Sequence, residues 1–571
     1  MSAGGQSSLV LFFFMKEAHM EWKWKGFRSI KEAIDFNTKG KADEILSPGS
    51  SFPVIQNADI CAMWLIYYAV NDVPITIVGD YDCDGICASA SLYLALRAAG
   101  AKYVYVRLPK RMSEGYGMSP KIIGEIPYGV VVTVDNGIAA HEAVRQAKEK
   151  GLIVIITDHH LPVVKDGEIV LPEADLIVDP HVESSLIAKG PIYRNTFNDY
   201  CGAGLVYRIA GAMLRDRKVL RQISAFAAIA TVADVMPLLS DNRKIFAEGV
   251  QSIQDATITT GLKALVDSLR SGGIVTESDI GFKIAPMLNA PGRLIDDGAS
   301  LGLGLLLENS AENAQHILDE VNELNENRKQ IKAAALKRAA SYIAETNQEH
   351  TNPVIINDPE TPEGVIGLVA GTVCEDFGET AIVFTEADGI LKGSGRACEE
   401  DNLKDALDTF NAKFPGVLLG YGGHKGAAGL SIRKGCLEVF KKGMSDILSD
   451  PKPKTDVLAY DLKIDAETIV DTAACLMDYS PFGEGNPPLV FRIDNFRAKQ
   501  FGKSYFTEIG NGSSIRMSGE GADIIGFGLA KQFHECGDPS CMDMIGKISY
   551  HYFNGRKSVQ VEMLDLKPCV R

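Results

Sequence analysis

The chain has 571 residues, more than one compact core normally holds, and this length indicates about three or four domains. Hydrophobic residues make up 46% and charged residues 23%, which is typical of a globular protein and excludes wholesale disorder. The formal net charge of −16 argues against a generally basic surface for nucleic acid, although a local basic channel is compatible with it.

Cysteine usage and the N-terminus bear on where the protein works. The 11 cysteines contain no CxxC pair and fit no zinc pattern, so we expect reduced, mostly packed thiols in a cytoplasmic protein. The apolar run Leu9–Met15 is too short to span a membrane and lacks the basic leader and cleavage site of a signal peptide, so we expect no membrane association. Met1, Met15 and Met20 are alternative starts, and the mass of the native protein would decide between them.

The stretch from about Ile75 to Pro180 alternates short apolar runs with helical segments such as Ala88–Ala99 and Ala139–Lys150, both expected to be amphipathic. The runs are β-branched and almost continuously apolar, as strands buried on both faces are. This pattern is typical of βαβ units and a parallel sheet, in which ligands bind beyond the carboxyl ends of the strands. The expected strands are Ile75–Gly79, Tyr103–Leu108, Val130–Val134, Ile153–Thr157 and Leu176–Val178.

The rest of the chain divides into further parts. A mostly helical region completes the first α/β domain, and a helical pattern without Gly or Pro, about Ala311–Glu345, follows as a connector. A second α/β segment and a linker precede a Gly-rich, strand-rich end that fits a small β domain. The expected limits are 1–50 for an N-terminal segment, 51–307 for the first α/β domain, 308–350 for the connecting helix, 351–450 for the second α/β domain and 456–571 for the β domain.

Acidic residues and histidines follow the predicted strands, at the point where each strand ends. Because the carboxyl ends of parallel strands meet at one edge of a sheet, we expect these side chains to lie close together. Carboxylates crowded in this way cannot all be buried without a cation. The segments are Gly79–Gly85 (GDYDCDG), Val134–Gly137 (VDNG), Thr157–His160 (TDHH) and Asp179–His181, and a further acid, Asp234, lies in an apolar helical stretch.

The donor types indicate the kind of cation. Aspartate oxygens combined with imidazole suit Mn²⁺ or Mg²⁺ better than a structural zinc. The acids suffice for two ions with one bridging carboxylate, and two ions about 3.5–4 Å apart can clamp a phosphodiester and generate hydroxide for in-line attack. Taken singly, each motif has an ordinary explanation as a loop, a turn or a cap. Their joint occurrence, in order and each at a strand end, favours a metal site.

In this order, the motifs resemble those of the DHH phosphoesterase superfamily, and later segments resemble the RecJ family within it. The resemblance runs from about Trp22 to the C-terminus. It implies a parallel-sheet DHH catalytic domain, a long connecting helix, a DHH-associated substrate-binding α/β domain and a C-terminal OB-like β-barrel. The later segments are Lys110-Arg111 with Glu114–Gly117, Cys201–Gly204, Ile284–Arg293, Glu363–Ala370, Gly393–Arg396, Gly422–Gly429 and Pro481–Phe491.

The resemblance also assigns roles to individual residues. Asp158 would orient a neighbouring histidine, His160 would face the scissile phosphate, and Asp135 would bridge the metals as the third member of the catalytic group. Arginine suits phosphate because its planar fork binds two oxygens at once. The expected metal ligands are Asp80, Asp82, Asp84, Asp135, His159 and Asp234, and the expected substrate-binding residues are Arg111, Tyr116, Asn289, Arg293, Ser394, Arg396, Gly423 and His424.

The activity that this resemblance implies is that of an exonuclease. Such an enzyme hydrolyses single-stranded DNA 5′→3′ to 5′-mononucleotides with two divalent cations, Mn²⁺ or Mg²⁺, in recombination and repair. The resemblance further implies a single-strand-binding protein and a helicase as partners, and we expect a monomer. The residues themselves identify neither the physiological metal nor the pathway, nor do they decide whether RNA is cleaved.

One position departs from the family pattern. Many RecJ sequences have an arginine where this chain has Met287. One phosphate contact is then absent or supplied elsewhere, and we expect weaker binding of the strand end without loss of the chemistry.

Two surface features have two interpretations each. Basic residues in the later part of the long helix form either a solvated face, which is favoured, or a stripe that contacts phosphates. Aromatic residues of the C-terminal domain are more often core than stacking platforms for bases. The residues are Arg328, Lys329, Lys332, Lys337 and Arg338 in the helix, and Tyr505, Phe506, Tyr550, Tyr552 and Phe553, beside Lys503, Arg556 and Lys557, in the C-terminal domain.

Two other classes of function are weighed against the exonuclease. A small-substrate DHH enzyme would degrade oligoribonucleotides or cyclic dinucleotides and would lack the OB-like domain, so the length and Pro481–Phe491 argue against it. A non-catalytic replication scaffold would have a decayed site, whereas the full ligand set is present here. Activity on a long strand and on a dinucleotide separates these classes.

Overall fold

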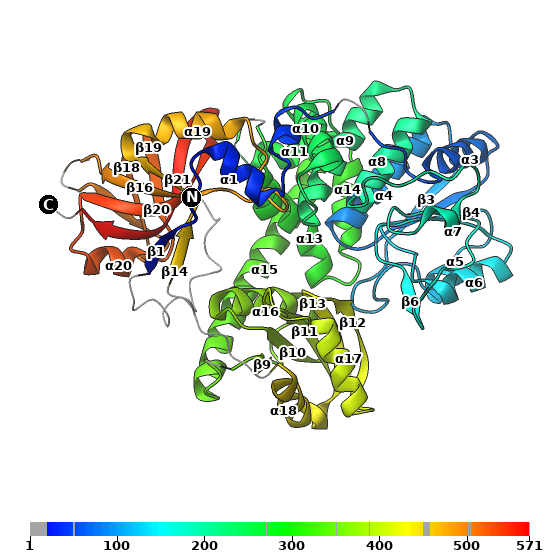
Figure 1. Cartoon of the computed structure of the whole chain (residues 1–571). Coiled ribbons are helices and arrows are strands. Elements are labelled where there is room, and N and C mark those ends of the chain that lie inside the picture. Colours follow the sequence, from blue (N-terminus) through cyan, green and yellow to red (C-terminus); the bar gives the residue numbers. More distant parts are fainter. Residues whose placement is uncertain are drawn as a thin grey trace.

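A computed structural model describes residues 20–49, 52–269, 271–272, 274–349, 351–387, 389–448, 457–500, 502 and 504–569. The alternative starts Met1 and Met15, the linker and Lys503 lie outside the described residues. Figure 1 shows the first α/β domain on the right, the second below it and the C-terminal domain on the left, with α15 between them. No helix of the described ranges has both the length and the apolar character that crossing a membrane requires.

The first domain is built on a five-stranded sheet in the order β3-β2-β4-β5-β8, and all of its strands are parallel. Its central strands are buried throughout, as their continuous apolar runs predicted. All five carboxyl ends therefore meet at one edge. The strands are β2 (Ile75–Val78), β3 (Val104–Arg107), β4 (Val130–Val134), β5 (Ile153–Thr157) and β8 (Leu176–Val178), and a separate hairpin pairs β6 (Val163–Lys165) with β7 (Glu168–Val170).

Helices cover both faces of this sheet. Val130, Val132 and Val134 pack against α3, α4 and α8, whereas Val131 on the other face packs against α5 and α6. Helix α4 is buried over most of its surface between the sheet and α8 and α9, so the amphipathic pattern expected for 88–99 is wrong. The helices are α3 (Ala58–Val70), α4 (Cys83–Ala98), α5 (Pro120–Glu125), α6 (His141–Glu149), α7 (Ser184–Ile187) and α8 (Gly202–Met213).

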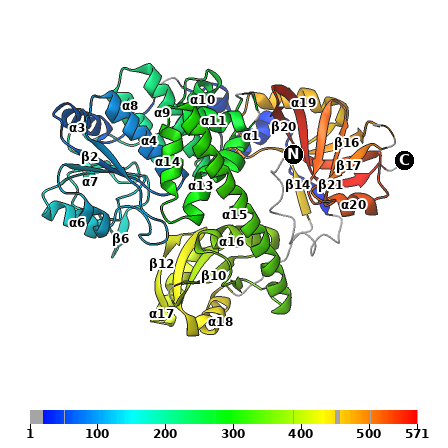
Figure 2. The same ribbon diagram turned by 180° about the vertical axis from the view of Figure 1, so that it is seen from behind.

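A helical region completes the first domain and leads into the connector. The long helix α15 packs against α11, α13 and α14 near its start and against α16 of the second α/β domain further on, as Figures 1 and 2 show. The predicted connector is confirmed. The elements are α9 (Arg217–Ala233), α10 (Ser240–Gln254), α11 (Thr260–Ser268), α12 (Glu277–Asp279), the π-helical turn η2 (Ile280–Ile284), α13 (Ala285–Leu294), α14 (Ala299–Leu307) and α15 (Ala311–Glu345).

The second α/β domain has a mixed sheet in the order β12-β13-β11-β10-β9, in which β9 and β10 are parallel. One face packs against α15 and α16, and the other packs against α17 and α18. Its elements are β9 (Val354–Asn357), α16 (Glu363–Phe377), β10 (Ala381–Ala387), β11 (Ile390–Arg396), α17 (Leu403–Lys413), β12 (Leu418–His424), β13 (Ala427–Arg433), η3 (Lys434–Cys436) and α18 (Leu437–Ile447).

The C-terminal domain is a seven-stranded sheet in the order β15-β16-β20-β21-β19-β18-β17 around a core that includes Phe491, Phe496 and Phe533. Its elements are β14 (Val457–Tyr460), β15 (Leu462–Asp465), η4 (Ala466–Thr468), α19 (Ile469–Met477), β16 (Val490–Arg497), β17 (Phe506–Ile509), β18 (Ser514–Gly519), β19 (Ala522–Gly526), α20 (Ala530–Glu535), β20 (Cys541–Phe553) and β21 (Arg556–Pro568).

The N-terminal segment packs on the C-terminal domain. Strand β1 (Glu21–Trp24) pairs in parallel with β14, and Trp22 Nε1 donates to Asp565 Oδ2 at 2.6 Å. Lys25 Nζ lies 2.9 Å from Asp461 Oδ1. Helices α1 (Ile30–Asn37) and α2 (Ala42–Leu46) add Ala33, Ile34 and Ile45 to the same core. The two ends of the described chain therefore form one body.

A buried arginine joins this body to the first domain. Arg243 of α10 donates to the backbone carbonyls of Tyr479, Ser480 and Pro481, and it forms no ion pair among the described residues. Burial lowers the pKa of Arg243 to about 10, which leaves it charged at neutral pH. Asn486 Nδ2 donates to the carbonyls of Tyr479 and Pro481 at 2.9 and 2.8 Å. The guanidinium group of Arg243 therefore provides hydrogen bonds to several backbone carbonyls at the domain junction.

Arg243→Met should loosen the C-terminal domain. The methionine fills space but leaves buried carbonyls without a donor, which should cost roughly 2–4 kcal/mol. Urea unfolding followed by tryptophan fluorescence measures this, because Trp22 and Trp24 lie on β1 against that domain. Arg221→Met is the control: it breaks a partly exposed pair with Asp255 and should cost less than about 1 kcal/mol. Equal losses in the two variants would contradict the role of Arg243.

Candidate metal centre and phosphate-binding site

The turn from β2 into α4 carries the first acids. The Asp82 side chain caps α4, because its Oδ1 accepts from the N–H groups of Asp84 at 3.0 Å and Gly85 at 3.1 Å. A Cβ at position 85 would lie 2.6 Å from the backbone nitrogen of Asp80, so only glycine allows this close approach. The tight turn holds Asp80, Asp82 and Asp84 at the carboxyl end of β2.

A second helix holds Asp84. Its two carboxylate oxygens accept from the N–H groups of Gly202 at 2.6 Å and Ala203 at 2.8 Å, at the start of α8. The positive end of a helix stabilises a carboxylate in this position. A Cβ on Gly202 would lie 2.5 Å from the Cβ of Asp135, so the helix can start here only with glycine. The Cys201–Gly204 motif thus seats α8 against two predicted ligands.

Asp135 and His159 bring the remaining ligands together. Asp135 follows β4 with a left-handed φ of 62°, which is uncommon for a residue other than glycine and typical of functional sites. His159 Nε2 lies 3.0 Å from Asp135 Oδ1 and 3.7 Å from Oδ2 of both Asp84 and Asp234. Asp234 caps the C-terminus of α9. Acids from three separate elements therefore surround the imidazole that follows β5.

The electrostatics of this cluster require a cation. The pKa of Asp84 is raised to about 6 and that of Asp234 to about 8, in both cases by burial first and then by nearby carboxylates. Burial and the charge of Asp84 also raise the pKa of Asp135. Burial lowers the pKa of His159 to about 3, so its ring is neutral and can coordinate a metal. No lysine or arginine of the described chain forms an ion pair with Asp80 or these three acids.

The ligand atoms fall into two groups that would each fit a divalent ion. Oxygens of Asp80, Asp82 and Asp135 lie within 4.8 Å of one another, and so do ligand atoms of Asp84, His159 and Asp234. Asp234 Oδ2 is buried without a hydrogen-bond partner, as a free ligand atom would be. Asp135 belongs to the first group and its Oδ1 contacts His159 of the second, which suits a bridging carboxylate. Hard oxygens with one imidazole fit Mn²⁺ or Mg²⁺.

His160 stands beside this centre and is held from two sides. Its Nδ1 lies 2.8 Å from Asp158 Oδ1, and Asp158 Oδ2 accepts from the N–H of Ile138 at 2.9 Å. Burial opposes the charged ring, but the hydrogen bond and charge of Asp158 raise the pKa of His160 to about 9. Tyr116 donates to the Asp135 carbonyl at 2.6 Å and its hydroxyl lies 3.2 Å from His160 Nδ1. The half-exposed ring is thus fixed as a cation at the mouth of the site.

Arginines gather around Arg293, at the end of α13. Burial first, and then the charges of Arg111, Arg328 and Arg396, lower the pKa of Arg293 to about 9. None of these four arginines forms an ion pair with a carboxylate in the described part of the chain. The charge of Asp82 acts on Arg293 in the opposite direction, which places the cluster next to the metal ligands. Unneutralised guanidinium groups of this kind fit phosphate.

Local contacts hold these arginines in place. The guanidinium of Arg111 lies 4.5 Å from the centroid of the Tyr81 ring. Arg293 Nη1 donates to the Gly364 carbonyl at 3.1 Å, and a Cβ at position 364 would lie 2.1 Å from the Arg293 carbonyl oxygen. The start of α16 therefore sits directly on α13, and this contact sets the second α/β domain against the site.

The second α/β domain contributes the other predicted substrate-binding residues. Arg396 Nη1 donates to Ser394 Oγ at 3.3 Å on β11. Burial lowers the pKa of His424, and the charges of Arg396 and His160 lower it further, so the two domains face each other here. Gly423 has a φ of 141°, and a Cβ there would lie 2.2 Å from the Ala427 carbonyl oxygen. The glycine permits a turn that another residue would obstruct.

Comparison with known proteins follows the same division of the chain. Residues 74–233 match the DHH family N-terminal domain, residues 351–450 the DHHA1 domain and residues 460–565 the RecJ OB domain. The single-stranded-DNA-specific exonuclease RecJ of Dickeya dadantii is 30% identical over 529 residues, which are 86% of this chain and 87% of that protein. The chain belongs to the RecJ family.

Further RecJ proteins extend this finding. The single-stranded-DNA-specific exonuclease RecJ of Escherichia coli is 32% identical over 456 residues, 75% of this chain and 76% of that protein. The crystal structure of RecJ from Thermus thermophilus in complex with Mn²⁺ gives a TM-score of 0.76 at 25% identity, and covers 98% of this chain and 81% of that chain. The resemblance expected from the motifs, and the fold that it implies, are confirmed.

Met287 and Asn289 of α13 were both singled out in the sequence. Met287 is 6% exposed and packs in the core of the first domain, so no phosphate contact comes from this position. Arg328 adds a guanidinium to the arginine cluster and is a candidate to supply that contact instead. Asn289 Oδ1 is buried without a hydrogen-bond partner, and its role in binding stays a prediction.

Some residues near the site were not among the predicted site residues. The basic stripe of α15 is split: Arg328 is half-buried and lies with Arg293, whereas Lys329 pairs with Glu326 and Arg338 with Asp358. A solvated face was favoured for the whole stripe, which is wrong for Arg328 and for Lys332, whose pKa is lowered by burial and by the charge of Arg328. Arg328 Nε donates to Asn325 Oδ1 at 3.2 Å, a contact that the sequence pattern did not indicate.

Asp179 and His181 follow β8 at the same sheet edge. Burial first, and then the nearby charge of Asp158, raise the pKa of Asp179 to about 8. Asp179 Oδ2 and His181 Nδ1 have no hydrogen-bond partner. They complete the row of strand-end polar groups that the sequence pattern predicted, next to the residue that orients His160.

In the C-terminal domain the aromatic residues are divided between core and surface. Tyr505, Phe506 and Tyr550 pack against the core, as the favoured interpretation predicted. Phe553 is 48% exposed, and its ring stacks on His551 with centroids 6.3 Å apart. Lys557 Nζ lies 3.7 Å from the centroid of the Tyr550 ring. The hairpin of β20 and β21 thus presents the exposed aromatic and basic groups.

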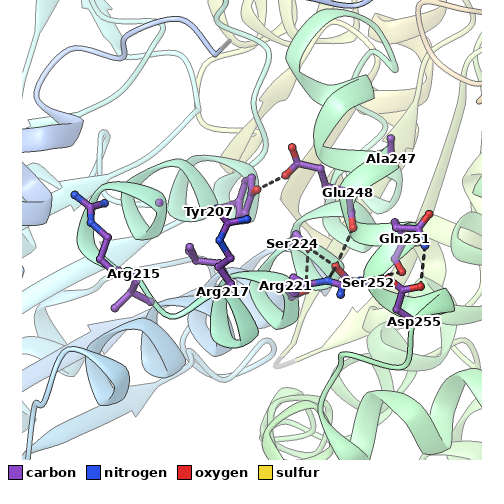
Figure 3. A pocket seen from close by; sticks show the side chains of 13 residues that line it. Tyr207, Arg215, Arg217, Arg221, Ser224, Ala247, Glu248, Gln251, Ser252 and Asp255 are labelled. Atoms are coloured by element: carbon purple, nitrogen blue, oxygen red, sulfur yellow. Dashed lines mark hydrogen bonds and ion pairs between the residues drawn. The ribbon is translucent and has the colours of Figure 1, made fainter. Parts of the chain in front are cut away.

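A separate cavity of about 810 Å³ lies between α8, α9 and α10 (Figure 3). None of the predicted site residues lines it. Within its wall, Arg221 pairs with Asp255, and Tyr207 donates to Glu248. This cavity is distinct from the metal centre.

Metal binding should release protons near neutral pH. Because the pKa values of Asp84 and Asp234 are raised to about 6 and about 8, the metal-free protein keeps protons on them that a cation must displace. The folded state then binds more protons than the unfolded state, so metal-free stability falls as pH rises from about 4 to about 8. Stabilisation by Mn²⁺ should accordingly grow with pH over this window.

Calorimetric titration with Mn²⁺ in buffers of different ionisation enthalpy measures the protons released. Asp234→Asn is the matched control, because it removes one titrating group and should lower the release. Binding of Mn²⁺ at pH 7 without any proton release would contradict the assignment.

Proposed function

We propose that the protein is a metal-dependent exonuclease that hydrolyses single-stranded DNA 5′→3′ to 5′-mononucleotides in recombination and repair. One observation carries the proposal: the arginine cluster adjoins the carboxylate–histidine cluster, because a Cβ on Gly292, next to Arg293, would lie 3.5 Å from the carbonyl oxygen of Tyr81, between Asp80 and Asp82. A phosphodiester held by the arginines would therefore reach the metal ligands. The RecJ relatives, which are named for single-stranded DNA, support the same substrate.

Different residues would bind the metals and contact the scissile phosphate. Asp80, Asp82, Asp84, Asp135, His159 and Asp234 would hold two divalent cations, Mn²⁺ or Mg²⁺. When bound, the cations supply Lewis acidity that polarises the scissile phosphate and activates water. Asp158 orients His160 toward the phosphate through the 2.8 Å contact, and Tyr116 fixes the ring from the other side. His160 then stabilises charge on the phosphate.

The 5′ end of the strand would be held between the two α/β domains. Arg111 and Arg293 of the first domain and Ser394, Arg396, Gly423 and His424 of the second would bind its phosphates. A strand held at its terminal phosphate in this way would be cleaved from that terminus. The arrangement favours the exonuclease over a small-substrate phosphoesterase, which would have no use for the C-terminal domain.

The finer expectations are part of this proposal. We infer a monomeric, cytoplasmic enzyme that works with a single-strand-binding protein and a helicase. The domain limits are proposed at 51–307, 308–350, 351–450 and 456–571, with 1–50 as the N-terminal segment. Light scattering and co-purification with the two partner classes test the first part.

A nuclease assay should show Mn²⁺-dependent release of mononucleotides from the 5′ end. A 5′-labelled strand should yield labelled mononucleotide at once, whereas a 3′-labelled strand should shorten progressively, and EDTA should stop both reactions. Asp135→Ala should lower turnover by at least about 100-fold while retaining DNA binding, because the bridging ligand is lost. Release from the 3′ end, or faster cleavage of a dinucleotide than of a long strand, would overturn the proposal.

Arg396→Gln should weaken recognition of the 5′ phosphate. The loss of a charged hydrogen bond should reduce kcat/KM about 10- to 100-fold on a 5′-phosphorylated strand and much less on a 5′-hydroxyl strand. Arg433→Gln is the control, since Arg433 is an exposed arginine at the end of β13 in the same sheet. If the two variants behaved alike on both strands, Arg396 would not bind the terminal phosphate.

A further inference from the structure

Phe282 is an exposed aromatic residue that the fold does not need. Its side chain is 81% exposed, more than any other large hydrophobic side chain among the described residues. Its neighbours Ile280 and Ile284 are fully buried, so the turn that carries it is firmly packed. This turn is π-helical, and such turns are frequent at functional sites. The exposed ring is therefore held in a fixed place without contributing to the core.

One side of this turn lies close to the metal centre. A Cβ on Gly281 would lie 3.8 Å from Val232 Cγ1, and Val232 lies at the end of α9, just before the predicted ligand Asp234. The turn also continues directly into α13, which carries Asn289 and Arg293. Phe282 thus belongs to the element that joins the metal-ligand helix to the phosphate-binding helix.

The other side of the turn faces the C-terminal domain. The backbones touch at Gly272 and Gly555, where a Cβ on Gly272 would lie 3.0 Å from the Gly555 Cα. Burial lowers the pKa of His551 on β20, and the charge of Lys283 acts in the same direction. Lys283, the residue next to Phe282, therefore lies near this strand. His551 stacks on the exposed Phe553. Phe282 therefore stands at the seam between the metal centre and the aromatic hairpin.

A flat ring in this position suits an unpaired base. A protein partner would need a continuous apolar patch, whereas the residues beside Phe282 in the chain are Gly281 and Lys283, and Lys283 pairs with Asp279 at 2.6 Å. Bases stack on exposed aromatic rings whatever their sequence. We propose that Phe282 is a stacking platform for a base of the DNA strand between the metal centre and the C-terminal domain. This inference rests on the proposed function.

Phe282→Ala tests the platform, and Phe282→Trp should preserve it. Binding of a long single strand is measured by fluorescence anisotropy with Mn²⁺ in the non-cleaving Asp135→Ala background. Loss of one base stack should weaken binding roughly 5- to 150-fold. Cleavage of a tetranucleotide by the otherwise unaltered enzyme should stay the same, because the short substrate does not reach the seam.

Tyr128→Ala is the matched control. Tyr128 is 67% exposed, but it precedes β4 and so lies at the amino ends of the strands, away from the metal edge. An abasic site moved along the strand should weaken binding at one position in the parent protein and at none in Phe282→Ala. Unchanged binding in Phe282→Ala, or an equal loss in Tyr128→Ala, overturns the platform. A parent enzyme that does not degrade the long strand overturns the proposed function instead.

Discussion

The crowding of carboxylates at one edge of the first sheet is the constraint on which the rest of the structure depends. Asp80, Asp84 and Asp135 are each less than 4% exposed, and histidine is the only basic side chain that pairs with any of them in the described chain. Burying like charges in this way is unfavourable unless something of opposite sign is supplied. The protein supplies part of it with backbone N–H groups at the starts of α4 and α8 and leaves the remainder to cations.

The surrounding architecture follows from keeping this edge open to a phosphate and closed to other contacts. Gly85 and Gly202 let two helices start against the acids, where any side chain would collide. On the far side, Arg293 of α13 and Arg328 of α15 form no ion pair in the described part of the chain, and the contact of Gly364 with Arg293 sets the second domain over them. Negative and positive clusters therefore face each other across the space where a strand would lie, on a body whose overall charge is −16.

The sequence predicted the parts of this arrangement that local pattern controls. The strands of the first sheet follow from β-branched apolar runs, α15 from a long helical pattern without Gly or Pro, and the clustering of acids and histidine from their places at strand ends. The burial and orientation of individual side chains were harder to predict from the sequence. The burial of α4 and of Met287 depends on helices far away in the chain, and α15 places Arg328 and Lys332 near Arg293 but leaves Lys329 paired with Glu326. No local sequence pattern indicates that the N-terminal segment packs on the C-terminal domain.

Because of that attachment, the order in which the chain is synthesised affects the order in which its domains can fold. Strand β1 emerges first from the ribosome, but its partner β14 begins at Val457, after both α/β domains have been made. Until then the indole of Trp22 has no Asp565 to bind and the apolar face of α1 has no core to enter. Contacts so distant along the chain form slowly, because a long loop must close first. The two α/β domains can thus complete the metal edge early, whereas the body that contains both ends of the described chain is the last to close.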